Sequence, residues 1–129
     1  MTDSEAPTGP NPLGFAYSED AHAHEEIRDI GDVPAVEVIN TVAIHLLTSA
    51  AVNLGLADDP HATVDLDEAR KLINALAGLV TASAPEIGDQ HARPLRDGLR
   101  SVQLAFREAS TIPDAPGAGP GEKWTGPVN

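Results

Sequence analysis

The longest apolar stretch of the chain covers residues 38 to 57, twenty positions without an Asp, Glu, Lys or Arg. Its apolar positions fall on two sides of a helix, so the predicted helix is apolar over most of its circumference. One broad face holds Val36, Ile39, Ala43, Leu46, Leu47, Ala50 and Leu54, and a second face holds Val38, Val42, Val52 and Leu56. Pro34 is typical of a first helical turn, with Asp32 or Val33 as the cap, and Gly55 is typical of a helix end. We therefore expect a central helix that packs on both sides.

A second, amphipathic helix follows this segment. Asp65 and Glu68 have the spacing of a capping box, which predicts a helix that opens at residue 66. Its apolar positions at helical spacing are Leu66, Ala69, Leu72, Ile73, Leu76, Leu79 and Val80. We expect this helix to end before Pro85. Gly78 lies inside it, where glycine is unfavourable, and this position favours the close approach of another helix.

A third helix is predicted by the rhythm of Leu95, Leu99, Val102, Phe106 and Ala109, which share one face. We place its start at Pro94, preceded by a loose turn from Asp89, because proline disfavours helical backbone at the residue before it. The pattern contains no convincing strand. The fold class is therefore all-α, a helical hairpin plus a third helix.

The predicted domain is short. Residues 33–111 form the expected three-helix domain, residues 1–32 an acidic disordered tail, and residues 112–129 a Pro/Gly-rich disordered tail. Four Pro and four Gly lie in the last segment, which is expected to bury too little surface to offset its chain entropy. A core of about eighty residues supplies only about 3–5 kcal/mol, so oligomerisation is expected.

The charge-free run is also long enough to cross a membrane. Its polar residues and its acidic flanks, Glu37 before and Asp58 after, argue against insertion, so we expect no transmembrane segment. We predict that the second face packs on a second copy, giving a dimeric helical bundle. The residues expected at this contact are Val38, Val42, His45, Val52 and Leu56.

A polar seam runs along the same helix at a spacing of four residues: Glu37, Thr41, His45, Ser49 and Asn53. The seam is expected to face solvent or to satisfy backbone groups. The alternative makes His45 a pH-sensitive residue of the interface, because a histidine changes charge near neutrality.

Charge and composition exclude several classes of function. The formal net charge is −12, which disfavours nucleic-acid binding except at a local basic stripe. The absence of cysteine excludes disulfides and thiolate metal sites. The N-terminus has no basic segment followed by an apolar run, so no secretory signal is visible and a cytoplasmic protein is expected.

No catalytic residue and no cofactor site can be assigned from the residues. Ser49, Ser83, Ser101 and Ser110 lie in no nucleophile motif, and GAGPGEKW at 117–124 follows no strand, as a phosphate-binding loop would. His22 and His24, followed by two glutamates, resemble metal ligands but lie in the acidic segment, so a solvated charge run is expected instead. His61 and His91 are isolated in predicted loops. No metal site is therefore assigned.

Two features remain as candidates for partner docking. Arg93, Arg96, Arg100 and Arg107 share one side of the third helix. The simplest interpretation is an exposed face paired with Asp97, Glu108 and nearby acids; the alternative is a stripe that docks an acidic protein, RNA phosphate or the acidic N-terminal segment. Trp124 is either the anchor of a linear motif or a ring that packs on its own helical domain.

Three segments resemble a bacterial family of small helical proteins, the domain of unknown function 1844. They are VPAVEVINTVAIHLLTSAAVNLGLADDP, LDEARKLINALAGLV and LRDGLRSVQLAFREAS, and the PGEKWTGPV ending is similar to that of actinobacterial members. These are packing and turn motifs. The resemblance implies a small helical fold without an assigned activity, cofactor or catalytic residue. Gene neighbourhoods in the family imply a link to the translation apparatus.

The expected function is that of a non-enzymatic helical interaction module with an unknown protein partner. Two alternatives remain open on the sequence. One is a membrane-peripheral structural or regulatory protein that inserts its uncharged helix; the other is a weak metal binder that uses His22 and His24.

Overall fold

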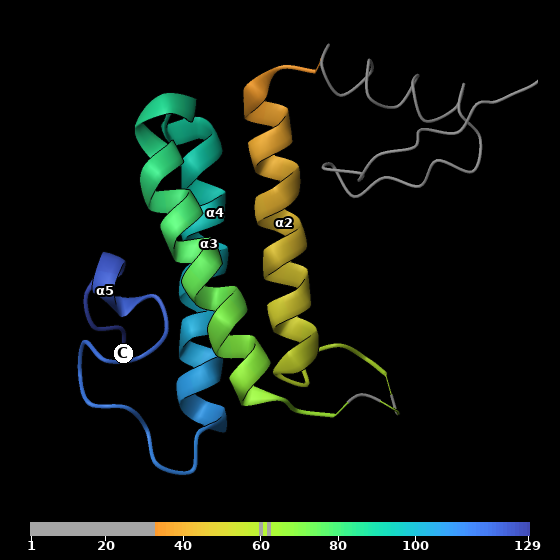
Figure 1. Cartoon of the computed structure of the whole chain (residues 1–129), viewed down its shortest axis with the longest axis vertical. Helices are drawn as coiled ribbons and strands as arrows, with labels where there is room; N and C mark the ends of the chain where they lie inside the picture. The colour runs from red at the N-terminus through yellow and green to blue at the C-terminus, as the bar shows by residue number, and fades with distance from the viewer. Residues whose placement is uncertain (1–32, 60, 62) are drawn as a thin grey trace, which may run out of the picture. The chain divides into compact units, whose positions relative to one another are not determined.

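The computed structural model describes residues 33–59, 61 and 63–129. Its helices are α2 (Ala35–Asn53), α3 (Leu66–Ile87), α4 (Asp89–Ala109) and α5 (Glu122–Thr125), and no strand occurs in the described residues (Figure 1). The all-α class is confirmed. By their contacts, residues 1–38 and 39–129 form two units, and the structure describes only residues 33–38 of the first. The prediction for residues 1–32 lies outside the described part.

Local signals fix the starts of the first two described helices. The Pro34 carbonyl accepts from the N–H groups of Glu37 and Val38, which opens α2. The Asp65 side chain caps α3 by accepting the N–H of Glu68 at 3.1 Å, as predicted. The reciprocal half of a capping box is not formed: the Asp65 N–H donates to the Asn53 carbonyl at 2.8 Å, and the Glu68 carboxylate binds Lys71 at 2.7 Å. This hydrogen bond and the charge of Glu68 raise the pKa of Lys71.

Loss of the cap gives a prediction for α3. Asp65→Ala removes the acceptor for the Glu68 N–H, and we expect the free energy of unfolding to fall by about 1 kcal/mol. Urea unfolding followed by circular dichroism measures the change. Asp58→Ala, in the exposed turn before the helix, is the control and should change stability by less than about 0.5 kcal/mol. Equal losses in the two variants would contradict the capping role.

The predicted end of the second helix before Pro85 and the predicted start of the third helix at Pro94 are both wrong. α3 continues through Pro85 to Ile87, and α4 starts at Asp89 with Pro94 inside it. Each proline removes one backbone hydrogen bond, a cost of up to about 3 kcal/mol. Buried side chains lie on both sides of the turn, Ala84 before it and Ala92 after it, so the packing of the two helices offsets that cost. Gly88, at φ 85°, forms the single-residue connection between them.

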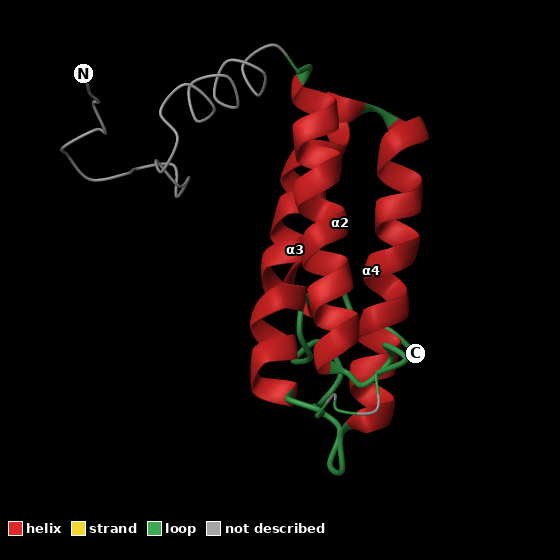
Figure 2. Ribbon diagram, turned by 90° about the vertical axis from the view of Figure 1, so that its right-hand side faces the viewer, coloured by secondary structure: helices red, strands yellow, loops and turns green. Residues whose placement is uncertain are grey.

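The core of residues 39–129 lies between α2, α3 and α4, which run along one another as three long rods (Figure 2). By their contacts, α3 and α4 form the closest helix pair. The inner face of α2 is the broad face predicted from sequence: Ala43, Ala50 and Leu54 are buried, and Leu46 and Leu47 pack against the core. The close approach of α2 occurs at Gly98 of α4, where an added Cβ would lie 2.7 Å from a methyl of Leu47. The close approach of another helix that was predicted at Gly78 therefore occurs at Gly98.

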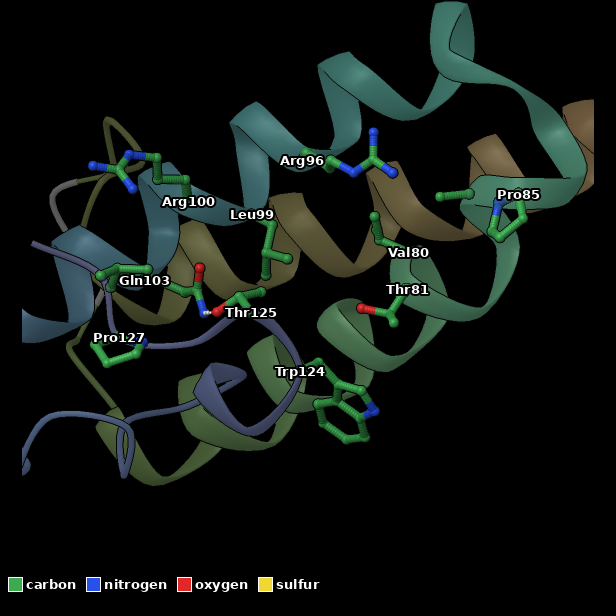
Figure 3. Close-up of a pocket in the computed structure, with 12 residues that line it drawn as sticks. Val80, Thr81, Pro85, Arg96, Leu99, Arg100, Gln103, Trp124, Thr125 and Pro127 are labelled. Atoms are coloured by element: carbon green, nitrogen blue, oxygen red, sulfur yellow. Dashed lines mark hydrogen bonds between the residues drawn. The ribbon is translucent and has the colours of Figure 1, made fainter.

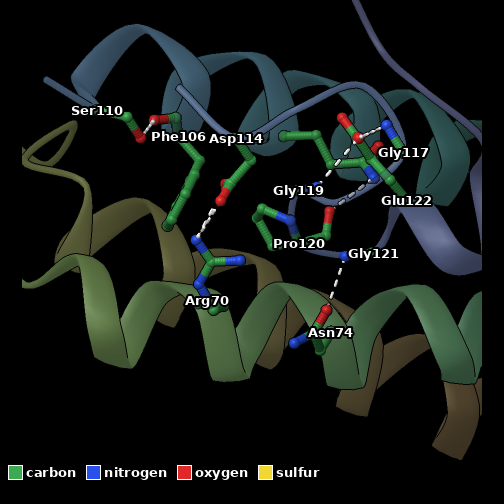
Figure 4. Close-up of polar contacts among 11 residues, drawn as sticks. Arg70, Asn74, Phe106, Ser110, Asp114, Gly117, Gly119, Pro120, Gly121 and Glu122 are labelled. Atoms are coloured by element: carbon green, nitrogen blue, oxygen red, sulfur yellow. Dashed lines mark hydrogen bonds and ion pairs between the residues drawn. The ribbon is translucent and has the colours of Figure 1, made fainter. Parts of the chain in front are cut away.

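The prediction of a disordered tail at residues 112–129 is wrong. This C-terminal segment folds back on α3 and α4 and contains α5, and Val128 and Glu122 are buried in it. The Asn74 side chain accepts the Gly121 N–H at 2.7 Å, and the Gln103 side chain donates to the Pro120 carbonyl at 3.0 Å (Figure 4). Polar side chains of the two helices thus bind the backbone of a segment that has few apolar side chains.

A single buried acid organises this segment from within. The Glu122 carboxylate accepts N–H groups from Gly117 at 2.8 Å and Gly119 at 3.1 Å (Figure 4). It also accepts the Val128 N–H at 3.3 Å. These bonds join the residues before α5 to those after it. The Glu122 carboxylate therefore holds the turns of this segment together, and composition alone does not distinguish this residue from the other acids of the chain.

Candidate functional site

The outer face of α2 is the apolar surface that the sequence predicted as an interface. Of the five residues predicted there, Val42 is 45% exposed, Val52 41% and Leu56 59%. Val38 and His45 are exposed as well. Ile44 adds a further exposed apolar side chain that the prediction did not include. In the described chain the second face of α2 is thus uncovered, whereas the first face packs on α3 and α4.

Polar side chains interleave with these apolar ones. Thr41, His45 and Thr48 are exposed, and with Ile44 and Ser49 they line a shallow hollow of about 280 Å³. The amide of Asn53 donates to the Ser49 carbonyl at 2.9 Å, which satisfies the end of the polar seam locally. The seam therefore faces solvent over most of its length, and it carries no charge between residues 38 and 57.

By length and composition alone, α2 would also be able to cross a membrane. Ala43 and Ala50 are the only buried residues among its nineteen. Core helices of soluble proteins can meet the same test, but they are mostly buried. With only two buried residues, α2 differs in this respect from such a core helix.

A second candidate is a pocket of about 450 Å³ in residues 80–128, which we call the Trp124 pocket (Figure 3). Three elements form it: the C-terminal half of α3, the middle of α4, and α5 with the residues after it. Its floor is apolar, with Val80, Ala84 and Leu99 all buried. Arg96, Arg100, Gln103, Trp124 and two threonines supply its polar and aromatic groups.

The structure divides the predicted arginine stripe. Arg96 and Arg100 line the Trp124 pocket together with Trp124, whereas Arg93 does not, and Arg107 lines a separate small crevice beside Asp114. Of the acids predicted to pair with the stripe (Asp97, Glu108 and nearby acids), the nearby Asp89 binds Arg93 at 2.7 Å and Arg96 at 3.3 Å. Neither Asp97 nor Glu108 forms an ion pair within the described residues.

Trp124 takes the second of the two predicted positions, packed on its own helical domain, although it keeps 41% of its surface exposed. Its ring lies over Gly78 of α3, where an added Cβ would be 3.4 Å from the ring. Lys123 lies 4.8 Å from the ring centroid. The absence of a side chain at Gly78 therefore makes room for an aromatic ring from the C-terminal segment, rather than for a helix.

The described residues contain no group of His, Asp and Glu side chains that could hold a metal ion. His22 and His24 lie outside the described part, and His61 and His91 are exposed. Two of the candidate serines bond to their own helices: Ser83 donates to the Leu79 carbonyl and Ser110 to the Phe106 carbonyl. Each of these hydroxyls is thus already hydrogen-bonded to the carbonyl four residues earlier in its own helix.

Sequence reasoning missed the polar residues that attach the C-terminal segment. Besides Asn74, Gln103 and Glu122, Arg70 binds both oxygens of Asp114 at 3.0 and 3.1 Å and lies 4.9 Å from the centroid of the Phe106 ring (Figure 4). The useful signal was a glycine at every second position in residues 117–121. A backbone without side chains can approach a helix closely, and this spacing is also compatible with an ordered turn.

The comparison with family models gave one match. A model described as "Domain of unknown function (DUF1844)" matches residues 35–108, more than half of the chain. The chain belongs to the DUF1844 family. No curated protein and no solved structure matches it. The DUF1844 match covers α2, α3 and α4 almost entirely and stops before the C-terminal segment. The outer face of α2 lies mostly within the family region, while one wall of the Trp124 pocket lies beyond it.

Proposed function

We propose that this DUF1844 protein is a non-enzymatic interaction module that associates with a second copy of itself through the outer face of α2. The observation that supports the proposal is the exposure of Val42, Ile44 and Val52 on a helix whose other face is packed in the core. A run of exposed apolar side chains along one helix face is a feature of interaction surfaces.

Charge favours a second copy as the partner. The chain carries a net charge of −12, so most approaches of two copies are repulsive. The α2 face has no Asp, Glu, Lys or Arg between residues 38 and 57. Two such faces can meet without burying a charge, and their alternating small polar and branched apolar side chains allow close helix packing. A symmetric pair of α2 helices would then cover the outer α2 face of each copy.

The test is the mass of the protein in solution. Sedimentation equilibrium of the full chain should give a dimer at about 10 μM. The double variant Val42→Glu/Val52→Glu places four acids in a symmetric interface and should weaken association at least about 100-fold. Ala75→Glu, at an exposed position of α3, is the control and should leave the dimer intact. A folded wild-type monomer at about 100 μM would refute the proposal.

The second candidate function is a membrane-peripheral protein that inserts α2, and the length and apolar composition of this helix favour it. Flotation with neutral phosphatidylcholine vesicles distinguishes the two. A dimer that stays at the bottom of the gradient supports self-association. A wild-type chain that floats as a monomer, and that stops floating in the Val42→Glu/Val52→Glu variant, would assign the α2 face to lipid instead.

Two finer roles remain predictions from the sequence. One is the link to the translation apparatus that the family resemblance implies, and the other is weak metal binding by His22 and His24. Both are separable from self-association, because neither uses the α2 face. Copurification with ribosomes at about 0.1 M salt and its loss at about 1 M salt would support the first, and calorimetry with zinc decides the second.

A further inference from the structure

We propose that the Trp124 pocket binds a small organic anion, a carboxylate or phosphate group attached to an apolar body. The pocket holds about 450 Å³, within the range of about 300–1,000 Å³ that is usual for small-molecule sites. It is formed by three segments that are distant in sequence, so its walls are fixed by the tertiary fold.

The charge of the lining favours an anion. Arg96 and Arg100 are one helical turn apart on α4, and the lining residues that the structure describes include no Asp or Glu. This local charge opposes the −12 of the whole chain, and an anionic group is the chemistry that a guanidinium group recognises best. The site would therefore concentrate an anion on a protein that otherwise repels anions.

Both arginines retain donors for such a ligand. Arg96 meets Asp89 at 3.3 Å, and this carboxylate also binds Arg93 at the shorter distance of 2.7 Å. Arg100 donates through one nitrogen to the main-chain oxygen of Asn129 at 2.9 Å. A guanidinium has five N–H donors, so these contacts leave several on each side chain. In Figure 3, Arg96 extends from α4 toward the α3 side of the pocket, where Val80 and Thr81 lie.

The remaining walls select an apolar body for the ligand. Val80, Ala84 and Leu99 form a buried floor. Trp124 also lines the pocket, and its ring lies against Gly78. An alkyl or aromatic group placed on this floor would remove apolar surface from water while the anionic head contacts Arg96. A simple inorganic anion would use the arginines alone and is expected to bind more weakly.

The protein contains one tryptophan, so Trp124 fluorescence reports on the site directly. Octanoate and octyl phosphate serve as probes, with octanol as the neutral analogue. For ligands of this size we expect dissociation constants of about 0.1–1 mM for the two anions. Octanol should bind at least about 10-fold more weakly. Equal affinity for octanol would overturn the assignment, as would an absence of any fluorescence or calorimetric change up to about 10 mM probe.

Variants on α4 locate the anion. Arg96→Gln should weaken octanoate about 10-fold, and Arg96→Lys, which keeps the charge, should recover part of that loss. Arg107→Gln lies on the same helix outside the pocket and should bind like the wild type. Val42→Glu/Val52→Glu should also bind octanoate like the wild type, because it alters only the α2 face. If this double variant lost octanoate binding while Arg96→Gln kept it, the probe would bind on α2 and the proposal would be overturned. The relative affinity of octanoate and octyl phosphate identifies the preferred head group.

Discussion

Gly121→Ala should release the C-terminal segment from α3 and α4. Gly121 has φ 76°, a conformation that costs an L-residue about 1–2 kcal/mol. An added Cβ would also lie 2.8 Å from Nε2 of Gln103 and 3.0 Å from Cβ of Ala77, and overpacking of this kind costs about 1–3 kcal/mol. We therefore expect the docking of the segment to weaken by about 2–5 kcal/mol. Trp124 fluorescence and hydrogen exchange at Val128 measure the change.

Gly117→Ala is the matched control for this substitution. Gly117 has φ 86°, but an added Cβ there would meet nothing within 4 Å, so only the backbone strain applies. We expect a loss of about 1–2 kcal/mol, clearly smaller than at Gly121. The difference between the two variants isolates the steric contact of Gly121 with α3 and α4. Equal effects would mean that the segment does not pack as closely as the structure shows.

Glu122→Gln should loosen the same segment from within. The carboxylate accepts three backbone N–H groups, one of them from Val128. A glutamine oxygen can keep the two glycine bonds, but its NH₂ group would face the Val128 N–H and leave that donor unpaired. Loss of one buried bond and of its charge assistance costs about 2 kcal/mol. Native-state hydrogen exchange should show the Val128 amide exposed, with helix content unchanged.

The control for this charge change is Glu108→Gln, at an exposed position of α4. It removes the same formal charge, and we expect it to change stability by less than about 0.5 kcal/mol. If the two variants lose the same stability, the effect comes from net charge and the hydrogen-bond role of Glu122 is wrong. A protected Val128 amide in Glu122→Gln would contradict it equally.

Gly121→Ala and Glu122→Gln should also affect the Trp124 pocket. Pro127 and Val128 line the pocket, and α5 carries Trp124 into it. Release of the segment should therefore weaken octanoate binding without altering the α2 face. The predicted dimer and the predicted ligand site can thus fail or succeed separately, because one uses α2 and the other uses α3, α4 and the C-terminal segment.

The two candidate surfaces differ in how far the sequence predicted them. The α2 face follows directly from an apolar, charge-free run, and four of its five predicted residues are among the exposed hydrophobics. The arginine stripe was recognised, but its division between a pocket and a separate crevice was not. That division depends on where the C-terminal segment covers α4, and residue spacing on one helix carries no such information.

The sequence by itself determined the helical class, the inner face of α2 and the cap at Asp65, because these depend on periodicity and on contacts within four residues. The tertiary structure alone decided the course of the chain through Pro85 and Pro94 and the folding of residues 112–129. In these cases the stabilising contacts join residues far apart, such as Asn74 and Gly121, 47 positions apart, and Arg70 and Asp114, 44 apart. Local propensity opposes helix at a proline and order in a Gly/Pro segment, and it is outweighed only when distant side chains bury and bind that backbone.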